Sequence, residues 1–303
     1  MTLAARGLQN VALPDGRALE FDVGGAKDGS VVVFHHGTPG ASLAWPALLD
    51  AASARGLRVI AASRAGYGGS SRDEGRAVAA AAGDTVELLD ALGVERFATI
   101  GWSGGGPHAL ACAALSAGRC VAALSVAGVA PYLPDEFDWT EGMGPENVKE
   151  FALGLEAGPA YDEMLASYRA FLLALRPEDV RSARELFGEL VSDVDEAAMA
   201  PEAAAFLLRN VARGLAPGVG GWRDDDQAFL RDWGVDLGAM SAPVGVWFGG
   251  QDLMVPLAHG EWLATNVGGA RATRLDDEGH LSIVQRMLPE MLDELIDLAG
   301  DRW

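Results

Sequence analysis

Ser103 has the residue type and the neighbours of a catalytic nucleophile. It lies in the run Gly101-Trp102-Ser103-Gly104-Gly105, where glycines stand on both sides of the serine. An apolar, β-like run (97–100) precedes it and an Ala-rich, helix-like run follows it, which indicates a tight turn between a strand and a helix. Such a turn exposes the hydroxyl. It also leaves the backbone N–H of Gly104 at a helix start, where it can bind a developing oxyanion.

A serine hydroxyl needs a general base, and the base needs an acid that orients it. Of the five histidines, His280 follows a β-like run (270–275) and precedes the last helical pattern, so we expect it on a loop beside the sheet. Asp252 stands just beyond the strand predicted at 244–248. It is our candidate for the acid, and capping of the next helix is compatible with that role. The order Ser103, Asp252, His280 is typical of one strand–helix fold.

A fourth motif follows an apolar run near the N-terminus, in His35-His36-Gly37-Thr38-Pro39-Gly40. With this turn added to the other three motifs, the chain resembles the α/β-hydrolase superfamily. Within it, the likeness is to serine hydrolases with a helical cap, a branch that includes esterases and proline iminopeptidases. The resemblance covers nearly the whole chain except about 131–238. It implies that the backbone N–H groups of Thr38 and Gly104 form the oxyanion hole.

We expect other residues in or between these motifs to have structural roles. We expect His36, Gly37 and Trp102 to support the turn or the pocket rather than to transfer protons. We expect His259 on the surface of a helix. The run Asp224-Asp225-Asp226 is expected to be solvated, or to lie at a helix N-terminus.

Apolar β-like runs alternate with helical patterns along most of the chain, which predicts an α/β fold. The resemblance makes this the α/β-hydrolase fold, with a mostly parallel eight-stranded sheet flanked by helices. Ligands of such sheets bind at the carboxyl ends of the strands. The four motifs all follow predicted strands, so we expect them along one edge of the sheet.

The strand pattern stops between residues 131 and 238. Helical patterns replace it near 145–156, 159–175, 177–190 and 195–214. We therefore expect a core domain made of 1–130 and 239–303, with 131–238 inserted as a helical cap. A cap of this kind shapes the substrate pocket and sheds water when it closes. The chain is expected to end in a helix near 282–298.

The composition narrows the choice of partners and cofactors. The chain has 303 residues and a formal charge of −20, from 43 acidic and 23 basic residues. This charge disfavours nucleic acid and anionic membranes, so we expect a small-molecule substrate, with a homodimer left open. No apolar run reaches the roughly 18 residues of a membrane span, and the N-terminus lacks a signal-peptide core, so we expect a cytoplasmic protein. No zinc-type cluster or nucleotide-binding motif is present, so we expect neither a metal nor a cofactor.

The expected reaction is hydrolysis of a small-molecule carboxylic ester through an acyl-enzyme. The first alternative is a proline iminopeptidase-like aminopeptidase, for which Glu141, Glu146 and Glu150 are candidate partners of a substrate ammonium. The resemblance also leaves open carbon–carbon or lactone hydrolysis and cofactor-free haloperoxidase activity on the same triad. Epoxide hydrolases are disfavoured because that family has Asp where this chain has Ser103. A small-molecule receptor of the same fold is the non-enzyme alternative.

Overall fold

The computed structural model describes residues 7–43, 45–133 and 135–303, in which eight strands form one sheet. In chain order the strands are β1 (Gln9–Ala12), β2 (Ala18–Gly25), β3 (Ser30–His35), β4 (Leu57–Ala62), β5 (Phe97–Trp102), β6 (Cys120–Val126), β7 (Val244–Gly249) and β8 (Arg271–Leu275). Across the sheet they lie in the order β1-β2-β4-β3-β5-β6-β7-β8. The pairs β1–β2 and β2–β4 are antiparallel and the other pairs are parallel. The expected mostly parallel, eight-stranded sheet is confirmed.

Helices connect most of these strands. They are α1 (Pro46–Ser53), α2 (Ala80–Leu92), α3 (Gly106–Leu115), α4 (Pro145–Glu156), α5 (Pro159–Ala174), α6 (Arg184–Phe187), α7 (Asp193–Ala198), α8 (Pro201–Gly214), α9 (Gly220–Phe229), α10 (Leu257–Asn266), α11 (Ser282–Arg286) and α12 (Leu288–Ala299). Three short 3-10 turns are η1 (Ser103–Gly105), η2 (Gly188–Leu190) and η3 (Gly300–Arg302). Over the ranges that the structure describes, no helix is both long and apolar enough to cross a membrane.

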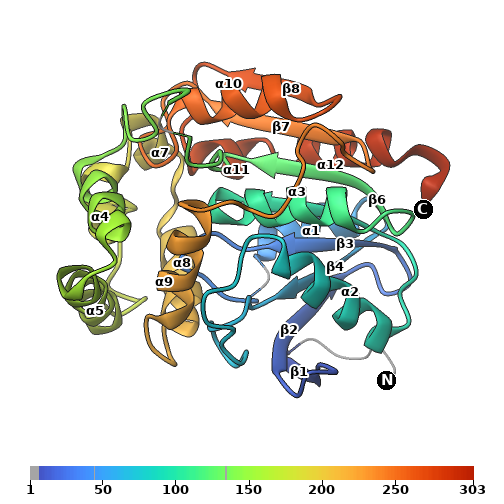
Figure 1. The fold of residues 1–303 in the computed structure, drawn as a ribbon, viewed down its shortest axis with the longest axis horizontal. Helices are drawn as coiled ribbons and strands as arrows, with labels where there is room; N and C mark the ends of the chain where they lie inside the picture. Colours follow the sequence, from blue (N-terminus) through green and yellow to red (C-terminus); the bar gives the residue numbers. More distant parts are fainter. Residues whose placement is uncertain (1–6, 44, 134) are drawn as a thin grey trace.

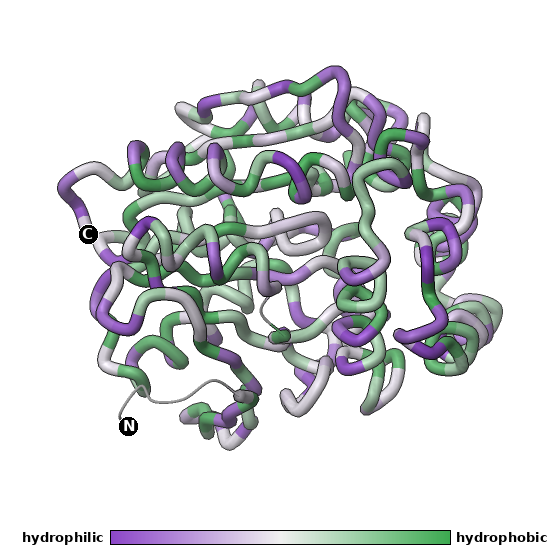
Figure 2. The backbone as a smooth tube through the Cα atoms, turned by 180° about the vertical axis from the view of Figure 1, so that it is seen from behind, coloured by the Kyte–Doolittle hydropathy of each residue, from purple (hydrophilic) through white to green (hydrophobic). Residues whose placement is uncertain are grey.

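The hydrophobic core has two layers, one on each face of the sheet. One layer contains Leu88 of α2, Leu110 of α3 and Leu263 of α10. The other contains Leu48 of α1 and residues of α11 and α12. Every residue of β6 is buried, as a central parallel strand covered on both faces requires. Figure 2 shows hydrophilic and hydrophobic residues alternating along the peripheral helices, which is the pattern of helices with one buried side.

Helices α4 to α9 lie together at one side of the sheet, between β6 and β7 in the chain. Figure 1 shows α4 and α5 outermost, with α8 and α9 between them and the strands, and α4 and α5 both pack against α9. The helix expected near 177–190 is only the short α6 followed by η2, and the helix expected near 195–214 is divided into α7 and α8. Pro201 starts α8, and proline lacks the N–H that would continue the previous helix. The expected last helix is likewise divided into α11 and α12, ahead of Pro289.

Candidate active site

The four sequence motifs meet along one edge of the sheet. Thr38 follows β3, Ser103 follows β5, Asp252 follows β7 and His280 follows β8. These four strands run parallel, with β3 beside β5 and β7 beside β8. Their carboxyl ends therefore face the same way and bring the four loops together.

Ser103 lies at a strained turn between β5 and η1. Its backbone φ is +57°, in the left-handed region that costs a non-glycine residue about 1–3 kcal/mol. The neighbouring positions must be glycine because other backbone atoms approach them closely. A Cβ on Gly101 would lie 2.1 Å from the carbonyl oxygen of Gly105, and a Cβ on Gly105 would lie 2.1 Å from that of His35. The turn is therefore compact enough to project the serine hydroxyl out of the sheet.

His280 and Asp252 form a buried hydrogen-bonded pair. The distance from His280 Nδ1 to Asp252 Oδ2 is 2.7 Å. The other carboxylate oxygen of Asp252 accepts the N–H groups of Met254 and Val255, at 2.8 and 2.7 Å, so this side chain is fixed on both sides. A carboxylate only accepts, so Nδ1 carries the proton and Nε2 is left as the basic nitrogen. The indole N–H of Trp102 donates to the carbonyl of His280 at 3.2 Å and orients its backbone.

The surroundings of His280 favour its charged form. Burial lowers the pKa of this imidazole, but the carboxylates of Asp252 and Asp195 outweigh burial and raise the pKa above its ordinary value. Ser103 and His280 line the same small cavity, although in the described part of the chain no hydrogen bond joins the Ser103 hydroxyl to the imidazole. Such bonds are often long before substrate binds and shorten in the reacting complex.

The turn after β3, which contains Thr38, packs against the turn that contains Ser103. A Cβ on Gly104 would lie 2.3 Å from Thr38 Oγ1, so the backbones of the two expected oxyanion donors lie close together. His36 Nε2 accepts the N–H of Arg64 at 3.1 Å, which leaves the proton on Nδ1, 2.7 Å from the carbonyl of Gly37. Burial and the nearby Arg64 hold the pKa of His36 well below its usual value. His36 is therefore a neutral residue that shapes the turn.

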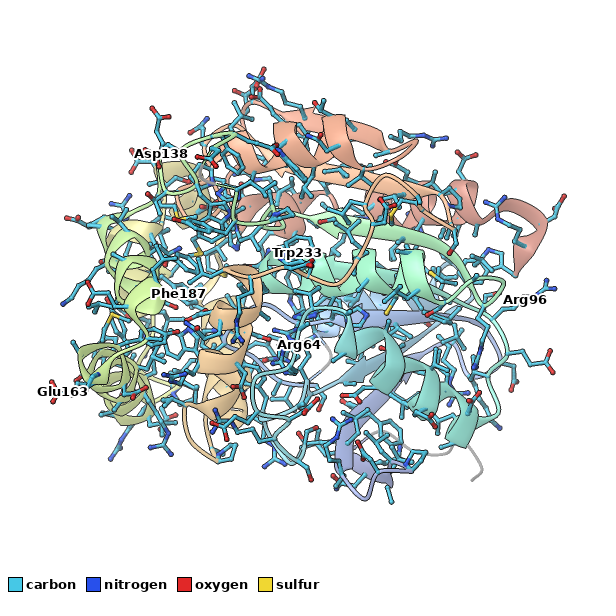
Figure 3. All side chains as sticks on the ribbon, in the orientation of Figure 1. Arg64, Arg96, Asp138, Glu163, Phe187 and Trp233 are labelled. Carbon is cyan, nitrogen blue, oxygen red and sulfur yellow. The ribbon has the colours of Figure 1, made fainter. Side chains whose placement is uncertain are left out.

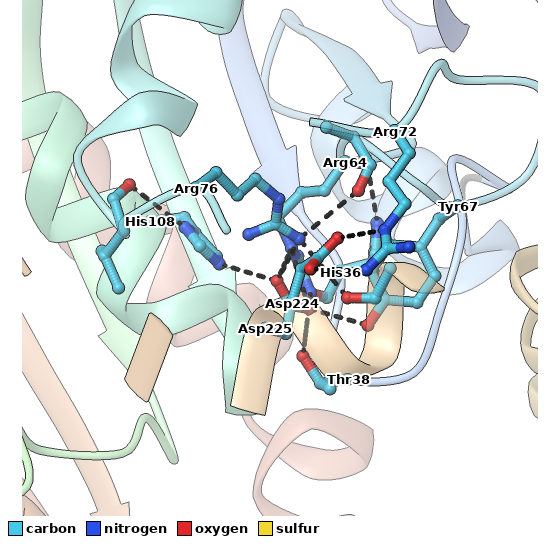
Figure 4. Close-up of polar contacts among 12 residues, drawn as sticks. His36, Thr38, Arg64, Tyr67, Arg72, Arg76, His108, Asp224 and Asp225 are labelled. Atoms are coloured by element: carbon cyan, nitrogen blue, oxygen red, sulfur yellow. Dashed lines mark hydrogen bonds and ion pairs between the residues drawn. The ribbon is translucent and has the colours of Figure 1, made fainter. Parts of the chain in front are cut away.

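Asp225 of α9 is the centre of a buried polar cluster (Figure 4). Its Oδ2 accepts the hydroxyl of Thr38 at 2.6 Å, Arg64 Nη2 at 2.6 Å and the hydroxyl of Tyr67 at 2.8 Å. Its Oδ1 accepts Arg76 at 2.6 Å. Arg64 follows β4 and also donates to Thr38 Oγ1 at 2.9 Å, and Figure 3 labels it among the side chains near the middle of the molecule. The helical segment is thus bonded to the side chain of Thr38.

The expectation that the acidic run at 224–226 is solvated or lies at a helix N-terminus is wrong, because all three aspartates are buried and lie beyond the first turn of α9. Asp224 binds Arg72 at 2.7 Å, and Asp226 accepts the hydroxyl of Tyr161. Burial would raise the pKa of Asp225, but Arg64 and Arg76 hold it well below its usual value. The charges of Asp224 and Asp225 are tolerated in the interior because arginine side chains lie against both carboxylates.

His259 is also buried, so its expected surface position is wrong. Its Nδ1 accepts the N–H of Ala130 at 3.1 Å, and its Nε2 lies 2.8 Å from the carbonyl of Trp139. Burial lowers its pKa to about 4. His259 is therefore a neutral link between α10 and the chain that leaves β6.

A cavity of about 310 Å³ lies between the sheet edge and the helical segment. Its walls are mostly apolar side chains, with Ser103, Thr38 and Gly104 on the sheet side and residues of α4, α5, α6 and α9 opposite. Glu150 and Asp226 are the buried acidic residues of this lining. A second cavity of about 80 Å³ shares Ser103 and also contains Trp102 and His280. The serine therefore stands where the two cavities adjoin.

Comparison with known proteins gives consistent matches. A family model described as alpha/beta hydrolase fold matches residues 30–286. A non-heme chloroperoxidase of Streptomyces lividans is 33% identical over 152 residues, which are 50% of this chain and 55% of that protein. A bifunctional esterase/perhydrolase of Acinetobacter calcoaceticus is 30% identical over 164 residues, 50% of this chain and 59% of that protein. The chain thus spans a little over half the length of these relatives. The crystal structure of a hydrolase from Pseudomonas aeruginosa PA01 superposes with a TM-score of 0.65 at 25% identity, over 98% of this chain and 100% of that one.

Proposed function

Because the chain belongs to the α/β-hydrolase fold family, we propose that it is a serine hydrolase that cleaves a small carboxylic ester. The observation that carries the proposal is the buried pair of His280 and Asp252, 2.7 Å apart, in a cavity that also contains Ser103 at its strained turn. These residues would supply a base, an orienting acid and a half-buried nucleophile in one place. The esterase activity named for one relative supports the choice of substrate class.

In the proposed mechanism, Ser103 Oγ attacks the ester carbonyl carbon while His280 Nε2 takes the hydroxyl proton. The carbonyl π electrons move to oxygen, and the N–H groups of Thr38 and Gly104 stabilise the resulting oxyanion. The intermediate expels the alkoxide, which receives the proton from His280 and leaves as an alcohol. Water then attacks the acyl-enzyme by the same steps and releases the acid and free Ser103. Asp252 keeps Nδ1 protonated and stabilises the imidazolium in both halves.

We also propose that residues 131–238 act as a cap over this reaction. Helices from this segment form the wall opposite Ser103, so a bound substrate would be enclosed between sheet and helices. Enclosure removes water and strengthens the electrostatic contacts to the reacting atoms. The unequal cavities, about 310 and 80 Å³, favour an ester with one bulky apolar side and one small side.

An aminopeptidase that takes an N-terminal ammonium is the second candidate. The observation that favours it is the pair of buried carboxyl groups, Glu150 and Asp226, in the lining of the larger cavity. Burial raises the pKa of Glu150, and burial together with Glu150 raises the pKa of Asp226, so a substrate cation beside the pair would favour their charged forms. Of the other candidates, Glu146 also lines this cavity, while Glu141 is exposed and lies outside the lining.

The first experiment is labelling with a fluorophosphonate probe, with the adduct located by mass spectrometry. We expect one adduct on Ser103, absent from Ser103→Ala. Unlabelled protein would then be assayed with short acyl esters and with a prolyl arylamide. Turnover of esters alone supports the first candidate. Arylamide turnover that is lost in Glu150→Gln supports the second. Ligand binding without labelling or turnover would overturn both and favour a receptor.

A further inference from the structure

Asp195 contacts the loop that carries His280, although it comes from the helical segment. It belongs to the short helix α7 and is fully buried. Its carboxylate accepts three successive backbone N–H groups of the base-bearing loop, from His280 at 3.1 Å and from Leu281 and Ser282 at 2.8 Å each. It also accepts the hydroxyl of Ser192 at 2.9 Å. Four donors directed at two oxygens match a carboxylate, which only accepts.

The loop that carries His280 is shaped to admit this carboxylate. A Cβ on Gly279 would lie 2.5 Å from Asp195 Oδ1 and 2.7 Å from its Cγ, so any larger residue at 279 would displace it. The N–H of Gly279 instead donates to Ser282 Oγ at 2.8 Å, which closes the turn around the carboxylate. The position of the His280 backbone is therefore set jointly by α7 and by Trp102, whose indole holds the carbonyl of His280.

Within the described ranges, Asp195 has no cationic partner. Among the described residues, no arginine, lysine or histidine side chain forms an ion pair with it, whereas Asp225 has two arginines. The charged groups that act on the His280 imidazole are Asp252, by direct contact, and Asp195. Both carboxylates oppose the effect of burial, which by itself disfavours the imidazolium. A buried negative charge without a cation partner, next to a histidine that must become positive, is suited to stabilise that positive state.

We propose that Asp195 is a positioning residue that fixes His280 and stabilises its imidazolium form during acyl transfer. This inference rests on the proposed function of His280 as the general base. Under this proposal the helical segment would influence the general base as well as enclose the substrate. The competing account is that Asp195 only caps the start of α11 and attaches α7 to the core. Both accounts expect a loss of stability when Asp195 is removed, but only the first expects His280 to respond to the lost charge.

The test is an NMR titration of the His280 imidazole in Asp195→Asn, which needs no substrate. The matched control is Glu202→Gln, which removes one negative charge from an exposed side chain at the start of α8. We expect Asp195→Asn to lower the pKa of His280 by about half a unit or more, because a nearby opposite charge is lost. Glu202→Gln should leave it unchanged. Fluorophosphonate labelling of Ser103 should slow by roughly 10- to 100-fold in Asp195→Asn, as expected for a displaced base.

A folded Asp195→Asn protein with the wild-type pKa of His280 would overturn the proposal, even if labelling slows. If that variant does not fold, Gly279→Ala replaces it, because the added methyl displaces the carboxylate but keeps its charge in the protein. A lowered pKa of His280 and slower labelling in Gly279→Ala support the proposal, and wild-type values of both overturn it. If wild-type protein neither labels nor turns over esters while Asp195→Asn still lowers the pKa, the electrostatic coupling is supported and the proposed hydrolase function fails.

Discussion

Replacing Thr38 by valine tests whether the helical segment controls the proposed oxyanion turn, residues 36–40. The hydroxyl of Thr38 donates to Asp225 at 2.6 Å and accepts from Arg64 at 2.9 Å. Valine has nearly the same shape but makes neither bond. The charged partners keep each other, because Arg64 and Asp225 remain in direct contact at 2.6 Å. Thr38→Val therefore removes the link between α9 and the turn without leaving a buried charge unpaired.

The size of the effect follows from these contacts. A hydrogen bond to a charged group contributes about 1.5–3 kcal/mol, and Asp225 retains its other donors, so we expect the free energy of unfolding to fall by about 2–3 kcal/mol. Complete loss of one oxyanion donor costs about 10²–10³ in kcat. Arg64 still donates to the carbonyls of His36 and Gly37, so the turn is loosened rather than released. We therefore expect kcat to fall by roughly 10- to 100-fold with little change in KM.

The assay pairs Thr38→Val with Thr38→Ser, which keeps the hydroxyl and loses one methyl group, worth about 0.8 kcal/mol. Urea denaturation gives the free energy of unfolding, and hydrolysis of a short acyl ester gives kcat and KM. We expect the serine variant to stay near wild type in both. If the valine variant is as stable and as active as the serine variant, the bond between Asp225 and Thr38 does not hold the turn, and the reasoning is wrong.

Three further predictions concern the same site and its supports. Gly104→Ala should reduce kcat by about 10² or more in a folded protein, because its Cβ would lie 2.3 Å from Thr38 Oγ1. Gly83→Ala, in open space on α2, is the control and should leave kcat unchanged. Asp225→Asn should lower the free energy of unfolding in urea by roughly 3–5 kcal/mol, because Arg64 and Arg76 lose their buried partner; a loss below 1 kcal/mol would contradict this. Burial lowers the pKa of His108 and of His259 from 6.5 to about 4, so as the pH falls these imidazoles are protonated in the unfolded chain before they are protonated in the folded one. The free energy of unfolding should therefore be highest above pH 6.5 and fall by roughly 3 kcal/mol per histidine toward pH 4. In His259→Gln the total fall over this pH range should be smaller by the roughly 3 kcal/mol that His259 contributes.

Asp225 and Asp195 of the helical segment contact two different loops of the candidate site. Asp225 of α9 is bonded to the turn that carries Thr38, and Asp195 of α7 is bonded to the loop that carries His280. In both cases an acidic side chain contacts a loop of the core and is fully buried there. A cap held in this way would influence the proposed chemistry through the geometry of the loops beneath it, as well as through the exclusion of water.

The sequence by itself determined the features that depend on neighbouring residues. Strand propensity and burial of short apolar runs predicted the sheet, and glycines around Ser103 predicted the tight turn that the structure shows with a φ of +57°. Prolines predicted the starts of α4 and α5. Ser103, Asp252 and His280 each follow a predicted strand, which predicted their loops at one edge, because parallel strands present their carboxyl ends together.

Only the tertiary structure determined the burial and the contacts of polar residues whose partners are far away in the chain. Asp225 meets Arg64 across 161 positions and Asp195 meets His280 across 85. The sequence predicted a solvated acidic run at 224–226 and a surface position for His259, and both are buried. An isolated charge is strongly disfavoured in the interior, and it becomes acceptable there only when specific donors lie against it. Those donors come from distant segments, so composition and local pattern carry no signal for them until the fold brings the segments together.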